Sequence, residues 1–191
     1  MKLRALLLAL LVIAPMPALA DGVVDKLITP ADRIRLNNYA QTRQQAIAEA
    51  RSGGEAGELA QLETILAKRV QSFAGFDMTG NWQCRTIKTG GQLPLVIYGW
   101  FKCRVTDDGS GWKLEKISGS QRTTGRFYDE SDRRLIYLGS QYVNEEKPKP
   151  YGSGAETDQV GYAFRTGPKE WRIELPAPHY ESKLDILEFR R

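Results

Sequence analysis

From Thr79 to Arg191 the apolar residues of this 191-residue chain recur at every second position, which constrains the fold more than any other feature. Successive side chains of a β-strand point to opposite faces of a sheet, so a period of two indicates strands with one buried face. Groups of Gly, Pro, Asp and Ser separate these segments, as is typical of turns. The pattern predicts strands over residues 80–88, 98–106, 112–118, 121–128, 135–142, 159–166, 171–175 and 184–190.

Eight short strands joined by tight turns, with no helix between them, are typical of an antiparallel barrel or sandwich. We therefore expect residues 79–191 to form one antiparallel β domain. One connection is long, NEEKPKPYGSGAETD at residues 144–158, and it is charged and rich in Pro and Gly. We interpret it as a mobile flap over one end of the domain.

Residues 21–78 are predicted to form an antiparallel helical hairpin in front of the β domain. Thr29 and Pro30 have the residue types of a helix cap and a first helical position, and this helix should stop at Gly53-Gly54. In the second helix one face carries Leu59, Leu62, Leu66, Val70 and Phe73. We expect this face to pack on the β domain. A partner-binding or membrane-surface helix is the alternative, which the mixed charges of its polar face disfavour.

The first twenty residues have the pattern of a secretory signal peptide. Lys2 and Arg4 precede a short apolar run, and Ala18-Leu19-Ala20 resembles a cleavage site, so the mature chain should begin at Asp21. We expect a periplasmic or secreted protein with no membrane span after cleavage. Removing Lys2 and Arg4 from the 27 basic residues leaves 25 against 23 acidic ones. This near balance argues against a nucleic-acid partner.

The two cysteines, Cys84 and Cys103, are predicted to form a disulfide, because an isolated pair in an oxidising compartment is typically bonded. Both have the inward parity of their strands. If the cysteines lie directly opposite each other, Trp82 faces Val105 and Thr86 faces Phe101, which keeps every inward residue inside. A redox-active pair is the alternative, and the C-x-x-C spacing that it favours is absent.

The sequence resembles the calycins, the group that includes the lipocalins and secreted bacterial inhibitors. The resemblance depends on Gly80-Asn81-Trp82 at the start of eight strands and on the terminal LDILEFRR. It implies an eight-stranded, antiparallel up-and-down barrel, with Trp82 closing the base and Arg190 or Arg191 packed over its indole ring. The whole chain also resembles an uncharacterised domain family of small exported proteins from Gram-negative bacteria. A helical hairpin before the barrel, and a disulfide between its first two strands, depart from the calycin pattern.

The residue inventory offers little for catalysis, metal binding or cofactor binding. The single histidine, His179, lies between prolines and a tyrosine with no matching serine motif, and both cysteines are used in the predicted disulfide. We therefore predict no catalytic, metal-binding or cofactor-binding residues. The open alternative is a hydrolase that uses paired strand carboxylates, drawn from Glu115, Glu174, Asp185 and Glu188.

The best candidate for a partner surface is a stripe on the outer face of the second predicted strand: Tyr98, Trp100, Lys102 and Arg104. Aromatic residues and arginine are enriched at binding hot spots. Packing of this stripe against the N-terminal helices explains the pattern equally well.

These features favour a non-catalytic binding module of the cell envelope that docks on another envelope protein, as secreted inhibitors do. This hypothesis predicts a filled barrel, because the inward positions are crowded with Trp, Leu, Phe and Ile. The alternative is a lipocalin-like carrier, which predicts a cavity and a small apolar ligand.

Overall fold

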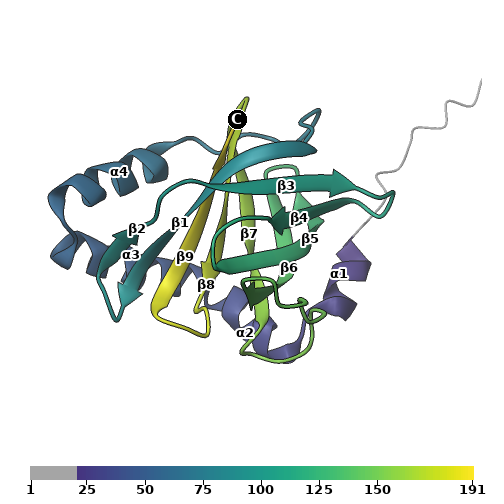
Figure 1. The fold of residues 1–191 in the computed structure, drawn as a ribbon, viewed down its shortest axis with the longest axis horizontal. Coiled ribbons are helices and arrows are strands. Elements are labelled where there is room, and N and C mark those ends of the chain that lie inside the picture. Colours follow the sequence, from purple (N-terminus) through teal and green to yellow (C-terminus); the bar gives the residue numbers. More distant parts are fainter. Residues whose placement is uncertain (1–20) are drawn as a thin grey trace, which may run out of the picture.

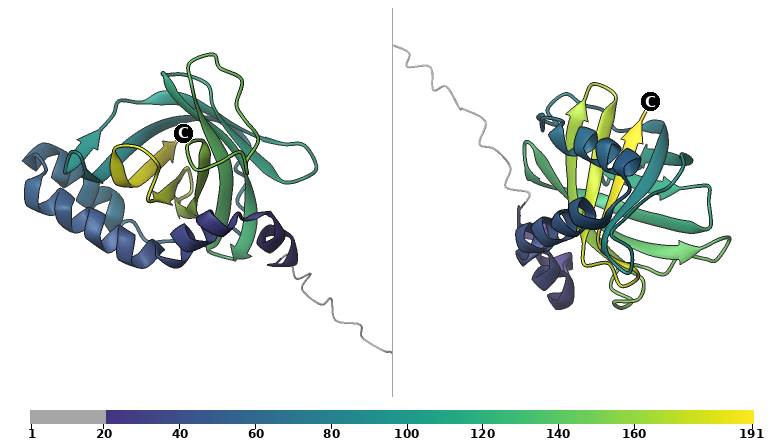
Figure 2. Two further views of the ribbon diagram at one scale, coloured as in Figure 1. Left: turned by 90° about the horizontal axis from the view of Figure 1, so that it is seen from below. Right: turned by 90° about the vertical axis from the view of Figure 1, so that its left-hand side faces the viewer.

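The computed structural model describes residues 21–191, and the predicted signal peptide at residues 1–20 lies outside this range. An antiparallel β-barrel forms the centre, and helices α1–α4 make an arc along one flank of it (Figure 1; Figure 2). The strands are β1 Gly80–Gly91, β2 Leu95–Ile97, β3 Phe101–Asp107, β4 Trp112–Lys116, β5 Gln121–Ser131, β6 Arg134–Val143, β7 Asp158–Gly167, β8 Glu170–Pro176 and β9 Ser182–Arg190.

The barrel consists of β1 and β3–β9, and it is closed. Each of these strands pairs antiparallel with the next one, and β9 returns to pair with β1. This arrangement confirms the predicted eight-stranded up-and-down barrel. Closure also leaves its strands without the free edges that would otherwise invite pairing with another chain.

The short strand β2 was not predicted, and it changes the start of the strand predicted over residues 98–106. Ile97 of β2 pairs with Ile87, and Phe101 of β3 pairs with Cys84, so both strands lie along the same side of β1. Ile97 and Phe101 are four residues apart, whereas their partners on β1, Ile87 and Cys84, are three residues apart. One residue is therefore extra, and the chain bulges between β2 and β3. Strand β3 therefore begins at Phe101.

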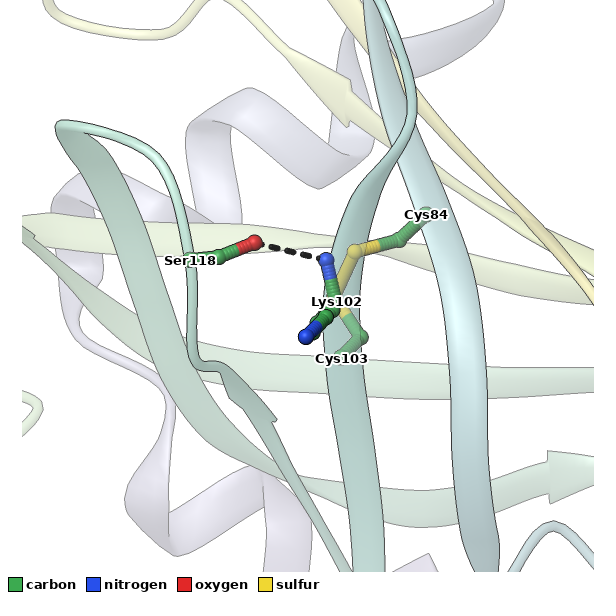
Figure 3. The surroundings of a disulfide bond; sticks show 4 residues. All are labelled: Cys84, Lys102, Cys103 and Ser118. Carbon is green, nitrogen blue, oxygen red and sulfur yellow. Dashed lines mark hydrogen bonds between the residues drawn. A yellow bond between two sulfur atoms is a disulfide. The ribbon is translucent and has the colours of Figure 1, made fainter.

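Cys84 and Cys103 form the predicted disulfide between β1 and β3, but in a different register from the predicted one (Figure 3). Cys84 lies opposite Phe101, and Cys103 lies opposite Trp82. The bridge is therefore diagonal, with the two Cα atoms 5.9 Å apart. The predicted direct opposition of the cysteines, and the pairs that follow from it, were wrong by two residues. A shift of two keeps every side chain on its face, so alternation cannot detect it.

The N-terminal helices are α1 Asp21–Leu27, α2 Pro30–Asn37, α3 Tyr39–Gly53 and α4 Ala56–Ala67. The predicted cap is confirmed, because the Thr29 hydroxyl accepts a hydrogen bond from the backbone N–H of Asp32. The predicted continuous first helix was wrong, since it is divided at Asn38. The division lets α2 pack on β7 while α3 packs on β1 and β9. None of the helices within residues 21–191 is long and apolar enough to cross a membrane.

The second predicted helix ends at Ala67, so Val70 and Phe73 lie outside it. From Lys68 onward the chain crosses one end of the barrel. The backbone N–H of Gln71 donates to the carbonyl of Arg165 at 2.9 Å, and Phe73 joins the apolar core inside the barrel. This tertiary burial outweighs the helical spacing that Phe73 shares with the leucines before it.

Helices α3 and α4 cover the outer face of β1 and β9, as expected for their apolar face. Ala46, Ala50, Leu62 and Ile65 of the helices form one buried cluster with the strand residues Ile87, Leu95, Leu184 and Ile186. Strands β1 and β9 are thus buried on both faces, with one set of residues inside the barrel and the other beneath the helices.

Trp82 closes the base of the barrel. Its indole N–H donates to the carbonyl of Met78 at 2.8 Å, and the guanidinium carbon of Arg191 lies 4.0 Å from the ring centroid. Gly80 has φ +114°, and a Cβ atom there would come within 3.1 Å of Arg191 Nη1. The absence of a side chain at Gly80 therefore lets Arg191 reach the base.

Of the two arginines expected for this contact, Arg191 makes it and Arg190 does not. Phe189 points into the barrel, so Arg190 points outward, and its guanidinium carbon lies 3.8 Å from the ring centroid of Trp100. Arg191 follows the end of β9 and can turn back over Trp82, held by its Nη1 donating to the carbonyl of Thr79 at 2.6 Å. The base contact expected from the calycin resemblance is thus present with the alternative arginine.

Candidate functional site in the barrel mouth

The interior of the barrel has an apolar half and a polar half. Around Trp82 it is filled by large side chains, among them Trp171 stacked on Phe189 with ring centroids 3.6 Å apart. At the other end a cavity of about 280 Å³ opens at the surface. The predicted filled barrel is therefore correct for the Trp82 half and wrong for the other half.

This mouth cavity is enclosed by strands β1, β4, β5, β6, β7 and β9 and by the connections at the same end. The β6–β7 and β8–β9 connections both lie at the end opposite the C-terminus (Figure 1). Hydroxyl, amide and charged groups predominate in its lining, which consists of Thr86, Lys88, Lys116, Gln121, Arg122, Thr123, Gln141, Tyr142, Val143, Glu146, Glu156, Thr157, Gln159, Pro178, Tyr180, Glu181, Asp185 and Leu187.

One wall carries a lysine and two carboxylates. Lys88 Nζ lies 2.5 Å from Glu181 Oε2, and Lys88 is the strand partner of Asp185 across β1 and β9. Burial acts to lower the pKa of Lys88, but Asp185 and Glu181 outweigh it and hold this pKa above its ordinary value. Burial raises the pKa of Asp185, against the opposing effects of Lys88 and a 2.5 Å hydrogen bond from Ser182.

The facing wall carries Lys116, the last residue of β4. Its side chain is 6% exposed, lines the mouth cavity and places Nζ 4.4 Å from the ring centroid of Phe101. Burial lowers the pKa of Lys116 to about 8, and the positive charges of Lys88 and Arg122 act in the same direction, against Asp185. Within residues 21–191 its ammonium group has no carboxylate within ion-pair distance.

The floor of the cavity is a group of neutral hydrogen-bonding side chains. The Thr123 hydroxyl lies 2.7 Å from Tyr137 Oη and also donates to the side-chain oxygen of Gln159. Tyr137 belongs to the apolar core, and burial raises its pKa. The floor therefore marks the boundary between the two halves and presents hydroxyl and amide groups to a ligand.

The connection over residues 144–157 forms one side of the mouth and is held by hydrogen bonds. Asp158 accepts backbone N–H bonds from Gly152 at 3.0 Å, Ser153 at 3.1 Å and Gly154 at 3.2 Å. Tyr151 Oη donates to Asp32 Oδ2 of α2 at 2.7 Å. These contacts favour a fixed rim rather than the predicted mobile flap.

The predicted partner stripe lies on the outside of the barrel, away from this cavity. Tyr98 is 38% exposed, and Lys102 and Arg104 are exposed. The backbone N–H of Lys102 donates to Ser118 Oγ at 2.7 Å, which ties β3 to the β4–β5 connection (Figure 3).

Trp100, the remaining member of this stripe, is half-buried between two guanidinium groups of the same chain. The guanidinium carbons of Arg85 and Arg190 lie 4.6 Å and 3.8 Å from its ring centroid. Strands β1 and β9 therefore supply these contacts.

The four strand carboxylates of the hydrolase hypothesis do not gather at one site. Asp185 points into the mouth cavity, whereas Glu115 is exposed on the outer face of β4. Glu188 is paired with Arg85 at 2.8 Å on the outer face, and Glu174 is buried beneath the helices. Across residues 21–191, no three His, Cys, Asp or Glu side chains are arranged to hold a metal ion.

Sequence reasoning missed the two cavity lysines, although the signal was present. Lys88 has the same parity as Trp82 and Cys84, and Lys116 the same parity as Leu114. Extending the inward face by one more step in each strand places a lysine inside the barrel. The prediction considered only the apolar inward positions, which lie in the filled half of the barrel.

The family comparison covers almost the whole described chain. A family model described as "Domain of unknown function (DUF4893)" matches residues 25–189. No curated protein and no solved structure matches the chain.

Proposed function

The chain belongs to the DUF4893 family, and from the geometry of its mouth cavity we propose that it is a non-catalytic binding protein for a small polar molecule. The observation that carries this proposal is the cavity itself, inside a closed barrel whose other end is filled. Ligand sites are typically concave and preformed, with a few convergent polar groups, and the mouths of β-barrels are among their common locations.

The lining favours a polar ligand over the apolar ligand of a lipocalin-like carrier. Thr86, Thr123 and Gln159 provide hydroxyl and amide groups, and Lys116 adds a positive charge. An apolar ligand would desolvate these groups without replacing their hydrogen bonds, at a cost of roughly 1–3 kcal/mol for each group.

We also propose that the protein is exported and acts in the periplasm or outside the cell. The disulfide between Cys84 and Cys103 supports an oxidising compartment, as does the leader pattern of residues 1–20. Docking on another envelope protein, through Tyr98, Lys102 and Arg104, is less well supported than a cavity ligand, because Trp100 is already covered by Arg85 and Arg190.

Catalysis is the second candidate function, and one observation favours it. Lys116 and Asp185 share the cavity, and the pKa of each is shifted toward the neutral form, chiefly by burial. Such pairs are enriched at catalytic sites. Binding is preferred because the other carboxylates considered for hydrolysis lie outside the cavity.

The proposal is tested by filling the cavity. Thr86 is half-buried and lines it, so Thr86→Trp should occupy much of its space, whereas Thr106→Trp on the exposed outer face of β3 is the matched control. Native mass spectrometry and thermal-shift screening against small polar metabolites should find compounds that bind the wild type and Thr106→Trp but not Thr86→Trp.

Two results would overturn parts of the proposal. If no compound distinguishes the wild type from Thr86→Trp, the mouth cavity is not a binding site. If a bound compound is chemically altered after prolonged incubation, and Thr86→Trp leaves it intact, the protein is a catalyst rather than a carrier.

A further inference from the structure

Lys116 is the one cation of the cavity wall that the described residues leave without a counter-ion. Lys88 is paired with Glu181 at 2.5 Å, and Arg122 is paired with Glu145 at 2.7 Å and also donates to a backbone carbonyl. Lys116 has only the face of Phe101 beside its ammonium group. A contact of this kind stabilises a cation by about 0.5–2 kcal/mol, which is less than the several kcal/mol that burying an ion costs.

The charges around Lys116 include carboxylates, but none of those described lies within ion-pair distance of its ammonium group. Lys88 and Arg122 face it from β1 and β5, and Asp185 faces it from β9. Glu181 already pairs with Lys88, and the buried Asp185 lies beyond ion-pair distance of Lys116. The other two carboxylates of the lining, Glu146 and Glu156, are exposed at the rim. A ligand carboxylate would supply the direct partner that the buried ammonium group of Lys116 lacks.

The charges of the cavity wall limit the charge of the ligand, and the cavity volume limits its size. One unmatched cation beside a carboxylate suits a singly charged group, because a doubly charged phosphate would be repelled by Asp185. The cavity of about 280 Å³ is at or below the lower limit of sites for drug-sized molecules. Its neutral part, with Thr86, Thr123 and Gln159, suits hydroxyl or amide groups.

Resting on the proposed binding function, we propose that the ligand is a small organic acid whose carboxylate pairs with Lys116. The rest of the molecule, with hydroxyl or amide groups, lies against Thr123 and Gln159 at the cavity floor. Lys116 is thereby the residue that selects acids over neutral molecules of the same shape.

The test compares acids with neutral counterparts of nearly equal size. Acetate is paired with acetamide, and glucuronate with glucose, in NMR titrations of the full-length mature protein at pH 6.5. Each acid should bind at least ten times more tightly than its neutral counterpart and should shift the amide signals of Thr123 and Gln159.

Two substitutions that each remove one positive charge show whether Lys116 causes the preference for acids. Lys116→Met should remove the preference for the acids, whereas Lys113→Met, at an exposed outward position of the same strand, should retain it. Thr86→Trp should abolish binding of acids and neutral molecules alike.

The outcomes separate this inference from the function on which it rests. If neutral molecules bind in a manner that Thr86→Trp abolishes, but acids have no advantage or Lys116→Met keeps it, the carboxylate inference is wrong and the cavity remains a binding site. If neither these probes nor the metabolite screen gives binding that is sensitive to Thr86→Trp, the binding function is wrong as well.

Discussion

At the scale of single residues, the positions at the two ends of the barrel have opposite chemical characters. Trp82 and Arg191 seal the base with an indole, a guanidinium group and hydrogen bonds to the backbone. Lys116 and Asp185 at the mouth are buried charged groups that face open space. The base residues stabilise the fold, whereas burial of an unpaired charge destabilises it, so Lys116 is better explained by a ligand than by packing.

Lys116 should make the stability of the protein depend on pH. Below about pH 8 it is protonated in both the folded and the unfolded chain, so folding carries the whole cost of burying the charge. Between about 8 and the ordinary value of 10.5 the unfolded chain binds more protons, so the free energy of unfolding rises with pH. The full rise should be about 3 kcal/mol.

Urea unfolding of the wild type and Lys116→Met between pH 7 and 10 measures this rise. Lys116→Met should be more stable at pH 7, by about 1–3 kcal/mol, with the difference shrinking toward pH 10. Lys113→Met, which changes an exposed lysine of the same strand, should follow the wild type. Parallel curves for the wild type and Lys116→Met would contradict the pKa of about 8.

At the scale of elements, a buried ion cluster attaches helix α3 to the outside of the barrel. Glu174 of β8 has no exposed side-chain surface, and it accepts hydrogen bonds from Tyr39 at 2.6 Å, Arg43 at 2.6 Å and Arg172 at 2.7 Å. Burial acts to raise the pKa of Glu174, but Arg172 and Arg43 outweigh it and hold this pKa below its ordinary value. Tyr39 and Arg43 both belong to α3, so the cluster attaches α3 to β8.

Glu174→Gln should loosen α3 while leaving the barrel closed. Removing the carboxylate leaves Arg43 and Arg172 without their counter-ion, which should lower the free energy of unfolding by about 3 kcal/mol at pH 7. Because the folded pKa is depressed, the wild type should lose this contribution as the pH falls below about 4.5, and the variant should not. Glu115→Gln, on the exposed face of β4, is the control. Unchanged hydrogen exchange in α3 of Glu174→Gln would contradict the assigned role.

At the scale of the whole molecule, the helices and the barrel share a core and should unfold together. Ala46, Ala50 and Leu62 of the helices are buried against Ile87 and Ile186 of the strands. Separating the layers would expose these side chains to water, at about 25 cal/mol for each Å² of apolar surface.

The distribution of tryptophans allows this cooperativity to be measured. The chain has 4 tryptophans, all after residue 79, whereas helices α1–α4 all end by Ala67. Tryptophan fluorescence therefore follows the barrel, and circular dichroism at 222 nm is dominated by the helices. Guanidinium unfolding should give the same midpoint with both probes. Loss of the helical signal at a lower denaturant concentration would show that the helical layer unfolds independently.

Alternation in the sequence was enough to predict the barrel and its eight strands, since a period of two decides which residues face inward. The disulfide partners were predictable because only two cysteines are present. Alternation did not predict the register of the two cysteines, since a shift of two residues leaves the inward and outward sets unchanged. The choice between Arg190 and Arg191 over Trp82 also depended on where β9 ends.

Only the tertiary structure determined which residues form the candidate site. Lys88, Lys116 and Asp185 are far apart in the sequence, and they meet because closure of β1 against β9 brings the mouth ends of the strands together. Whether a barrel is hollow depends on how side chains from all its strands fill a shared volume, which no single strand encodes. The sequence by itself determined the wall of this barrel, and the packing of eight strands around a common axis determined that a cavity remained at its mouth.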